Sequence, residues 1–286
     1  MWLFKLLGFA TILTLSGSLP AQSQSKLDSF LAGLDSNNVY LRTGRLWVDS
    51  CRTAQKEMVP VTTKRRSTQA PPGKLTRQAL VRLESSYQQL HQTIYRQAIL
   101  TYLQLIYQRK RLDELTHRQE LLGELTEAIS WRKLKAPSNQ NEQAVQGLLL
   151  ELQEKCGQKK AIVNQLQQEL AALNGQQVVN LPSTAYPALP STKVLIRKGA
   201  MFPVYKLWYS RYVLLRRALA LNTRILQNRP SLSRLTSDLK TGQLMQANFM
   251  DQFINVSSLI DCHMRTERDL YLAAAYFTES RQRSLR

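Results

Sequence analysis

The sequence predicts an elongated all-α protein built from antiparallel, coiled-coil-like helical hairpins in two structural repeats, with little or no β-structure. Glycine and proline are scarce, at 11 and 10 of 286 residues, which favours long helices over sheets. Apolar residues recur at helical spacing over long stretches. Two polar breaks, near Pro137 and Gly242, each separate one such stretch from the next. Together these features predict a helical hairpin that occurs twice.

Residues 1–23 are predicted to be a signal peptide. Lys5 precedes an apolar run from Leu6 to Leu15, and the small residues Ala21 and Ser23 stand before a cleavage point. About ten apolar residues fall short of the ~20 that a spanning helix needs, which disfavours a membrane anchor. We therefore expect an exported protein.

An N-terminal helix and a basic loop are expected over residues 24–73, followed by the first hairpin over 74–175. Its first helix runs to about Lys135 and, at 1.5 Å per residue, forms a rod of about 90 Å. Its second helix ends at Gly175, a typical C-terminal cap. The apolar seam of this second helix follows steps of three and four, interrupted by one polar residue, Lys159; it comprises Val145, Leu149, Leu152, Cys156, Val163, Leu166, Leu170 and Leu173. Cys156 is therefore expected to be buried.

A proline-rich linker is predicted over residues 176–202, and the second hairpin over 203–286. Pro230 is expected to break or kink its first helix. The apolar face expected on that helix comprises Leu207, Leu214, Ala218, Leu221 and Ile225. The last helix carries a seam in phase with that of the first hairpin. When the two seams are aligned, His263 takes the position equivalent to Lys159. An internal duplication accounts for this match.

We find no pattern typical of an enzyme, and we expect no catalytic residues, metal or cofactor. The three histidines, His91, His117 and His263, are far apart in the sequence and form no ligand motif. Asp261, Cys262 and His263 are consecutive, and consecutive helical residues point in different directions. The three cysteines form neither a disulfide framework nor a zinc cluster.

The formal net charge of +19 attracts anions of every kind. Export argues against nucleic acid as a partner. The basic clusters fit two interpretations, solvated helix faces or contact with anionic headgroups or an acidic partner; they are Lys64 to Arg66, Arg109 to Arg111, Arg216 with Arg217, and the C-terminal arginines.

Several motifs resemble the TolC family of outer-membrane efflux proteins. Four segments carry the resemblance: "LDSFLAGLDSNNVYL" (27–41), "AILTYLQLIYQRKRL" (98–112), "PSNQNEQAVQG" (137–147) and "GQLMQANFMDQFINV" (242–256). The chain departs from the family in one respect. The family's long membrane strands have no counterpart in the short, charged segment from Val59 to Lys74, so outer-membrane association is an open question.

The resemblance implies a component of a cell-envelope efflux assembly, with coiled-coil duct helices in a homo-oligomer that is a trimer in the family. It also implies a location in the periplasm or outer membrane of a Gram-negative bacterium. A periplasmic adaptor and an inner-membrane pump are the implied partners. The expected adaptor-contact residues lie in the two turns, Lys135, Ala136, Pro137 and Ser138 in one, and Lys240, Thr241, Gly242, Gln243 and Leu244 in the other. The alternative is a non-transporting periplasmic helical scaffold that binds anionic envelope components.

Overall fold

A computed structural model describes residues 19–57, 77–133, 139–177, 185–189, 203–244 and 246–284. Within these ranges every regular element is a helix, which confirms the predicted all-α class. The helices are α2 (Leu19–Asn37), α3 (Val39–Glu57), α4 (Arg77–Lys133), α5 (Asn139–Leu173), α6 (Pro203–Gln227), α7 (Leu232–Thr241) and α8 (Gln246–Ser284). Residues 1–18 of the predicted signal peptide, the basic loop and most of the linker lie outside the described residues, whereas residues 19–23 form the start of α2.

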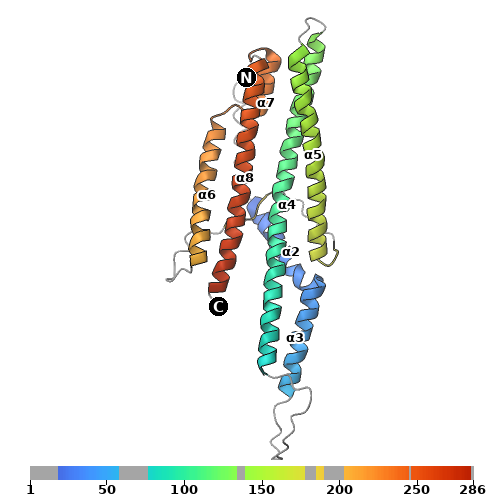
Figure 1. The fold of residues 1–286 in the computed structure, drawn as a ribbon, viewed down its shortest axis with the longest axis vertical. Coiled ribbons are helices and arrows are strands. Elements are labelled where there is room, and N and C mark those ends of the chain that lie inside the picture. The colour runs from blue at the N-terminus through green and yellow to red at the C-terminus, as the bar shows by residue number, and fades with distance from the viewer. Residues whose placement is uncertain are drawn as a thin grey trace, which may run out of the picture.

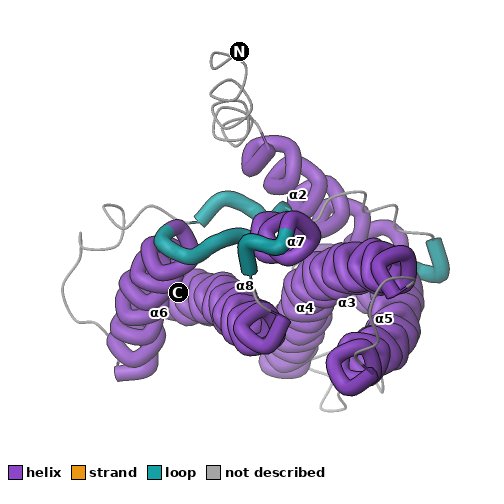
Figure 2. Tube along the Cα trace, turned by 90° about the horizontal axis from the view of Figure 1, so that it is seen from above, coloured by secondary structure: helices purple, strands orange, loops and turns teal. Residues whose placement is uncertain are grey.

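The long helices form an open row rather than a closed bundle. Helix α5 packs along α4, α6 packs along α8, and α4 contacts α8 in the middle of the row. Seen from above, α6 and α5 lie at the two ends of this row (Figure 2). Helix α7 covers the contact between α4 and α8, and α3 runs beside the first part of α4 (Figure 1).

The apolar seams lie where α4 meets its neighbours. On α5, Val145, Leu152, Cys156 and Leu170 are all buried, so the predicted register of this helix is confirmed. They join two core clusters, one that contains Tyr102 of α4 and one that contains Phe249 of α8. The 3.6-residue period thus places one stripe of each helix in the core.

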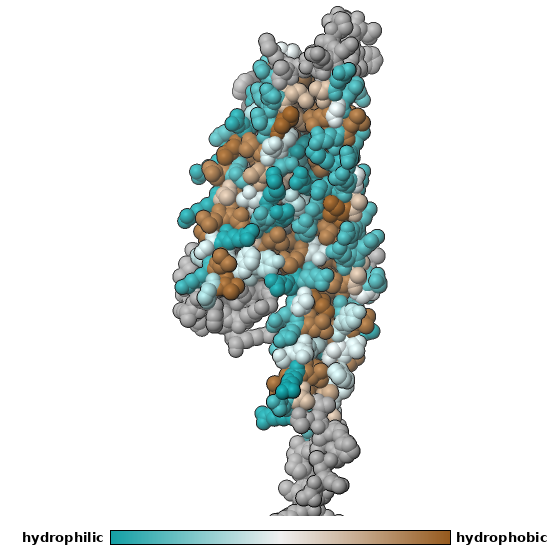
Figure 3. Space-filling model, viewed as in Figure 1, coloured by the Kyte–Doolittle hydropathy of each residue, from teal (hydrophilic) through white to brown (hydrophobic). Residues whose placement is uncertain are grey.

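Helix α6 packs through a different face from the one predicted. Leu207, Leu214 and Leu221 are 65%, 63% and 59% exposed, whereas Tyr212 is fully buried against α8. Trp208 stacks on Tyr276 of α8, with ring centroids 4.5 Å apart. Both faces of α6 are apolar, and the aromatic one is buried because it offers more area and ring stacking. Apolar side chains accordingly lie at the surface over α6 (Figure 3).

The N-terminal part folds as two helices that meet at Asn38. The Asn38 side chain accepts a hydrogen bond from the Leu41 backbone N–H at 3.1 Å and donates one to the Leu173 carbonyl at 2.8 Å. The first bond caps α3, and the second ties the α2–α3 joint to the end of α5. Asn37 adds a 3.0 Å bond from Nδ2 to Oδ1 of Asn174. These bonds fasten segments that are far apart in the sequence.

None of the helices in the described residues has a stretch long and apolar enough to span a membrane.

Candidate functional site

The turn after α7 has the geometry of a Schellman motif. Gly242 has φ 81° and ψ 10°, in the left-handed region. Its backbone N–H donates to the Leu239 carbonyl at 3.1 Å, and the Gln243 N–H donates to the Asp238 carbonyl at 2.8 Å. Leu239 and Leu244, on either side of the turn, both pack against the core cluster around Phe249, which fastens the turn to the helix row. The left-handed Gly242 and these two hydrogen bonds together close the end of α7.

Lys240, in the last turn of α7, forms an ion pair across the row. Its Nζ lies 2.7 Å from Oε2 of Glu124 on α4. The hydrogen bond and the charge of Lys240 hold the pKa of the Glu124 carboxyl below its usual value. This pair fixes the level of the α7–α8 turn against α4.

The two predicted turns lie toward the same end of the molecule but at different levels. Glu124 precedes the end of α4, Lys133, by nine residues, so the Gly242 turn lies about 14 Å short of that end. Figure 1 shows the end of α4 and the start of α5 reaching beyond α7. Lys135, Ala136, Pro137 and Ser138 fall outside the described residues. The adaptor-contact role of both turns stays a prediction.

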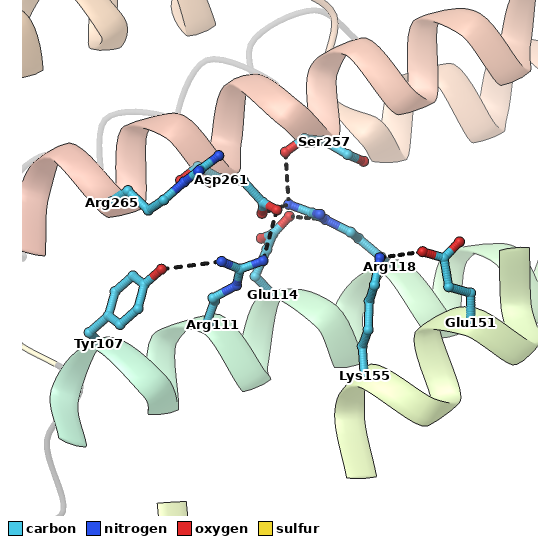
Figure 4. A network of polar contacts seen from close by, with 9 residues as sticks. All are labelled: Tyr107, Arg111, Glu114, Arg118, Glu151, Lys155, Ser257, Asp261 and Arg265. Carbon is cyan, nitrogen blue, oxygen red and sulfur yellow. Dashed lines mark hydrogen bonds and ion pairs between the residues drawn. The ribbon is translucent and has the colours of Figure 1, made fainter. Parts of the chain in front are cut away.

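A buried polar junction joins α4 to α8 in the middle of the row (Figure 4). The Arg118 side chain is 5% exposed, and its Nη2 lies 2.9 Å from Oδ1 of Asp261. Arg111 Nη2 lies 3.0 Å from the other carboxylate oxygen, so one carboxylate of α8 holds two arginines of α4. Arg118 also contacts Glu114 Oε1 through Nε at 3.0 Å and the Ser257 carbonyl through Nη2 at 3.2 Å. Such a junction holds two helices in one register.

A second set of charged contacts lies two turns along α8. Lys110 Nζ is 2.8 Å from Oε2 of Glu267 and 4.6 Å from the ring centroid of Tyr186. The guanidinium of Arg268 lies 4.7 Å from the ring centroid of Tyr107. These contacts place the segment 185–189 against the row.

The two polar seam residues approach this junction from different helices. Burial and the charge of Arg111 lower the pKa of Lys159, while Asp261 opposes the shift. Burial lowers the pKa of His263, with Lys110 adding to the shift and Glu267 opposing it. Both side chains are half-buried. At both positions the surroundings therefore disfavour the charged form of the side chain.

The sequence does not predict the ion pairs of this junction. In the sequence, Asp261 stands out only beside Cys262 and His263, and Arg111 only as part of a basic cluster. The polar seam positions Lys159 and His263 were the available signal, because polar residues on an apolar seam require partners nearby.

The junction arranges fixed charges and shows no reaction chemistry. Asp261 is occupied by two arginines. The part of the chain that the structure describes holds no cluster of three or more metal-ligating side chains. The arrangement supports register and packing.

Comparisons with known proteins bear on the fold. The sequence matches no protein-family model and no curated protein. A solved structure described as the outer-membrane channel OprN matches with a TM-score of 0.66 and 13% identity, over 92% of each chain. The chain shares its fold with an outer-membrane channel. At this identity the likeness concerns the fold alone.

Proposed function

We propose that this chain is a TolC-like subunit of a cell-envelope export assembly. Several copies associate side by side, as a homo-oligomer of the kind that the family forms as trimers, and their long helices form a duct in the periplasm. The α7–α8 turn and the α4–α5 end meet a periplasmic adaptor, which links the duct to an inner-membrane pump. The assembly associates with the outer membrane.

The observation that carries this proposal is the open row of helices, whose fold is similar to that of a channel. In the described residues, α5 packs mainly against α4 and α6 mainly against α8, so each end of the row has an unpaired side. The exposed leucines Leu207, Leu214 and Leu221 recur every seven residues along α6, as in a seam between neighbouring helices. A second copy packed on α6 would bury them.

Measuring the mass of the mature protein in solution tests the duct. We expect a homo-oligomer by light scattering. The dissociation constant of this oligomer should rise at least tenfold in a variant that combines Leu207→Ser, Leu214→Ser and Leu221→Ser. Val39→Ser with Leu46→Ser is the matched control, because these residues of α3 are 55% and 62% exposed. That control should keep the parent mass.

A monomeric parent at all concentrations would contradict the duct and favour the non-transporting scaffold. An adaptor and a pump encoded by neighbouring genes would support the export assembly. With such an adaptor in hand, Gly242→Val should weaken its co-purification while helix content stays near that of the parent. Equal co-purification by both proteins would reduce the turn to a connector.

A further inference from the structure

Helix α3 protrudes with the first part of α4 beyond the other helices, at the end opposite the turns (Figure 1). Its inward face packs on α4 through the buried Leu41 and Val48. Gly44 lies so close to Tyr87 that a Cβ there would be 2.9 Å from the ring. The outward face of α3 has no such neighbour among the described elements.

That outward face is apolar, aromatic and uncharged. Tyr40 and Trp47 are 73% and 64% exposed, and Val39 and Leu46 are 55% and 62% exposed. Each pair is seven residues apart, so each forms a line along the helix. The exposed residues between the two lines, Thr43, Ser50 and Ala54, carry no charge. Four large exposed side chains on one short helix mark an interaction surface.

Cations lie along one side of this face. Arg42, Arg45 and Lys56 are exposed there on α3, with Asp49 3.9 Å from Arg45. Arg52, on the same side, is paired with Glu84 of α4 at 2.6 Å. Residues 39–83 carry ten lysines and arginines against two acidic residues.

The opposite end of the rod has the reverse balance. Residues 113–154, which include the end of α4 and the start of α5, carry eight acidic residues against four lysines and arginines. The acidic residues lie along the helix bodies, since Arg132, Lys133 and Lys135 stand next to the turn itself. An anionic surface therefore attracts the α3 part of the chain more strongly than residues 113–154.

We propose that the outward face of α3 docks on an anionic lipid surface, with Tyr40 and Trp47 in the headgroup region. Tyrosine and tryptophan favour the membrane interface because their rings are apolar and their polar groups stay hydrated. Val39 and Leu46 enter the acyl boundary beside them, and the arginines contact lipid phosphates. The lipid anchors the rod by one end and directs the turns away from the membrane.

Vesicle flotation of the full mature chain tests this surface. We expect binding to vesicles of phosphatidylcholine containing one third phosphatidylglycerol, and at least tenfold weaker binding to pure phosphatidylcholine or in 0.5 M salt. Tyr40→Ser with Trp47→Ser should weaken binding to the anionic vesicles at least tenfold. Leu150→Ser with Ile254→Ser is the matched control, because these residues of α5 and α8 are 65% and 48% exposed.

A fluorescence measurement keeps the test independent of the folding of the α3 variant. In the mature chain, which lacks the predicted signal peptide with Trp2, replacing Trp131 and Trp208 by phenylalanine leaves Trp47 as the remaining tryptophan. Its emission should shift to shorter wavelength when the anionic vesicles are added. No shift, or equal flotation of the parent and the Tyr40, Trp47 variant, would overturn the proposal.

Two further outcomes would assign the face differently. Loss of vesicle binding by the α6 leucine variant, with the α3 variant unaffected, would move lipid docking to α6. A changed oligomeric mass of the α3 variant with unchanged flotation would make the face a protein contact. Both outcomes overturn the proposal, while the mass of the parent tests the duct separately.

Discussion

At the scale of single residues, two glycines end helices in the same conformation but in different surroundings. Gly175 has φ 66°, and a Cβ there would lie 2.1 Å from the Asn37 carbonyl oxygen. Gly242 has φ 81° and open space around it. The first position excludes a side chain through both conformation and close approach, the second through conformation alone.

This contrast predicts different costs for the same substitution. Gly242→Ala should lower the free energy of unfolding by about 1–2 kcal/mol, the cost of the left-handed conformation. Gly175→Ala should cost about 2–5 kcal/mol, because overpacking against Asn37 adds to that cost. Denaturant unfolding followed by circular dichroism measures both.

A helical glycine in open space provides the control. Gly157 on α5 has nothing within 4 Å of its Cβ position, so Gly157→Ala should raise stability by roughly 0.5–1 kcal/mol. Equal losses at Gly175 and Gly242 would show that the Asn37 contact relaxes without cost.

The Asp261 carboxylate is the residue on which the α4–α8 junction depends. Asp261→Asn should lower stability by about 1–3 kcal/mol, because Arg111 and Arg118 lose their shared carboxylate while Arg118 keeps its pair with Glu114. Asp49→Asn should change stability by less than about 1 kcal/mol, because its pair with Arg45 is exposed. Similar effects of the two substitutions in denaturant unfolding would mean that the junction admits solvent.

At the scale of helices, the seam of α5 contains one charged residue among apolar ones. Lys159 lies between Cys156 and Val163 on the seam, where burial and Arg111 lower its pKa. A lowered lysine pKa means that folding disfavours the charged form present at neutral pH. The seam tolerates this lysine at a cost to stability.

Replacing this lysine should therefore stabilise the protein. Lys159→Leu should raise the free energy of unfolding by about 1 kcal/mol, since it removes a disfavoured charge and extends the apolar seam. Lys160→Leu is the control. Lys160 is next to Lys159 but exposed, so its replacement should change the free energy of unfolding by close to zero. A lower melting temperature for Lys159→Leu would show that the charge is needed beside Asp261.

Helix α6 shows how far an apolar pattern predicts packing. The spacing of Leu207, Leu214 and Leu221 correctly indicated a helix. It did not indicate which apolar face meets α8, because Trp208, Tyr212, Leu215 and Leu219 form a second one. The choice depends on the shape of the partner helix, which supplies Tyr276 and Phe277 for ring contacts.

At the scale of the whole molecule, one helix sets the length. Helix α4 has 57 residues and spans about 86 Å. A compact domain of this chain length would have a radius of gyration of about 19 Å. The open row makes the protein a rod.

Small-angle scattering of the monomer should therefore give a maximum dimension above about 85 Å and a radius of gyration clearly above about 19 Å. The monomeric α6 variant makes this measurement possible if the parent assembles. Far-UV circular dichroism should show a helical spectrum. A compact particle, or substantial sheet signal, would contradict the fold.

Local patterns in the sequence predicted the long helices, the glycine ends of α5 and α7, and the buried seam of α5, but not the division of the N-terminal part into α2 and α3. Apolar residues at steps of three and four place Val145, Leu152, Cys156 and Leu170 on one side of a helix whatever that helix packs against. Gly175 and Gly242 end helices through backbone geometry that is local to each turn. These features depend on neighbours a few residues away.

The tertiary structure alone decided the partners. Arg118 meets Asp261 because α4 and α8 cross at one register, and Asn38 meets Leu173 because the α2–α3 joint lies at the end of α5. The open row, the level of the Gly242 turn and the outward faces of α3 and α6 follow from which helices lie side by side. Such choices arise from area, shape and charge summed over long-range contacts, and no short stretch of sequence contains them.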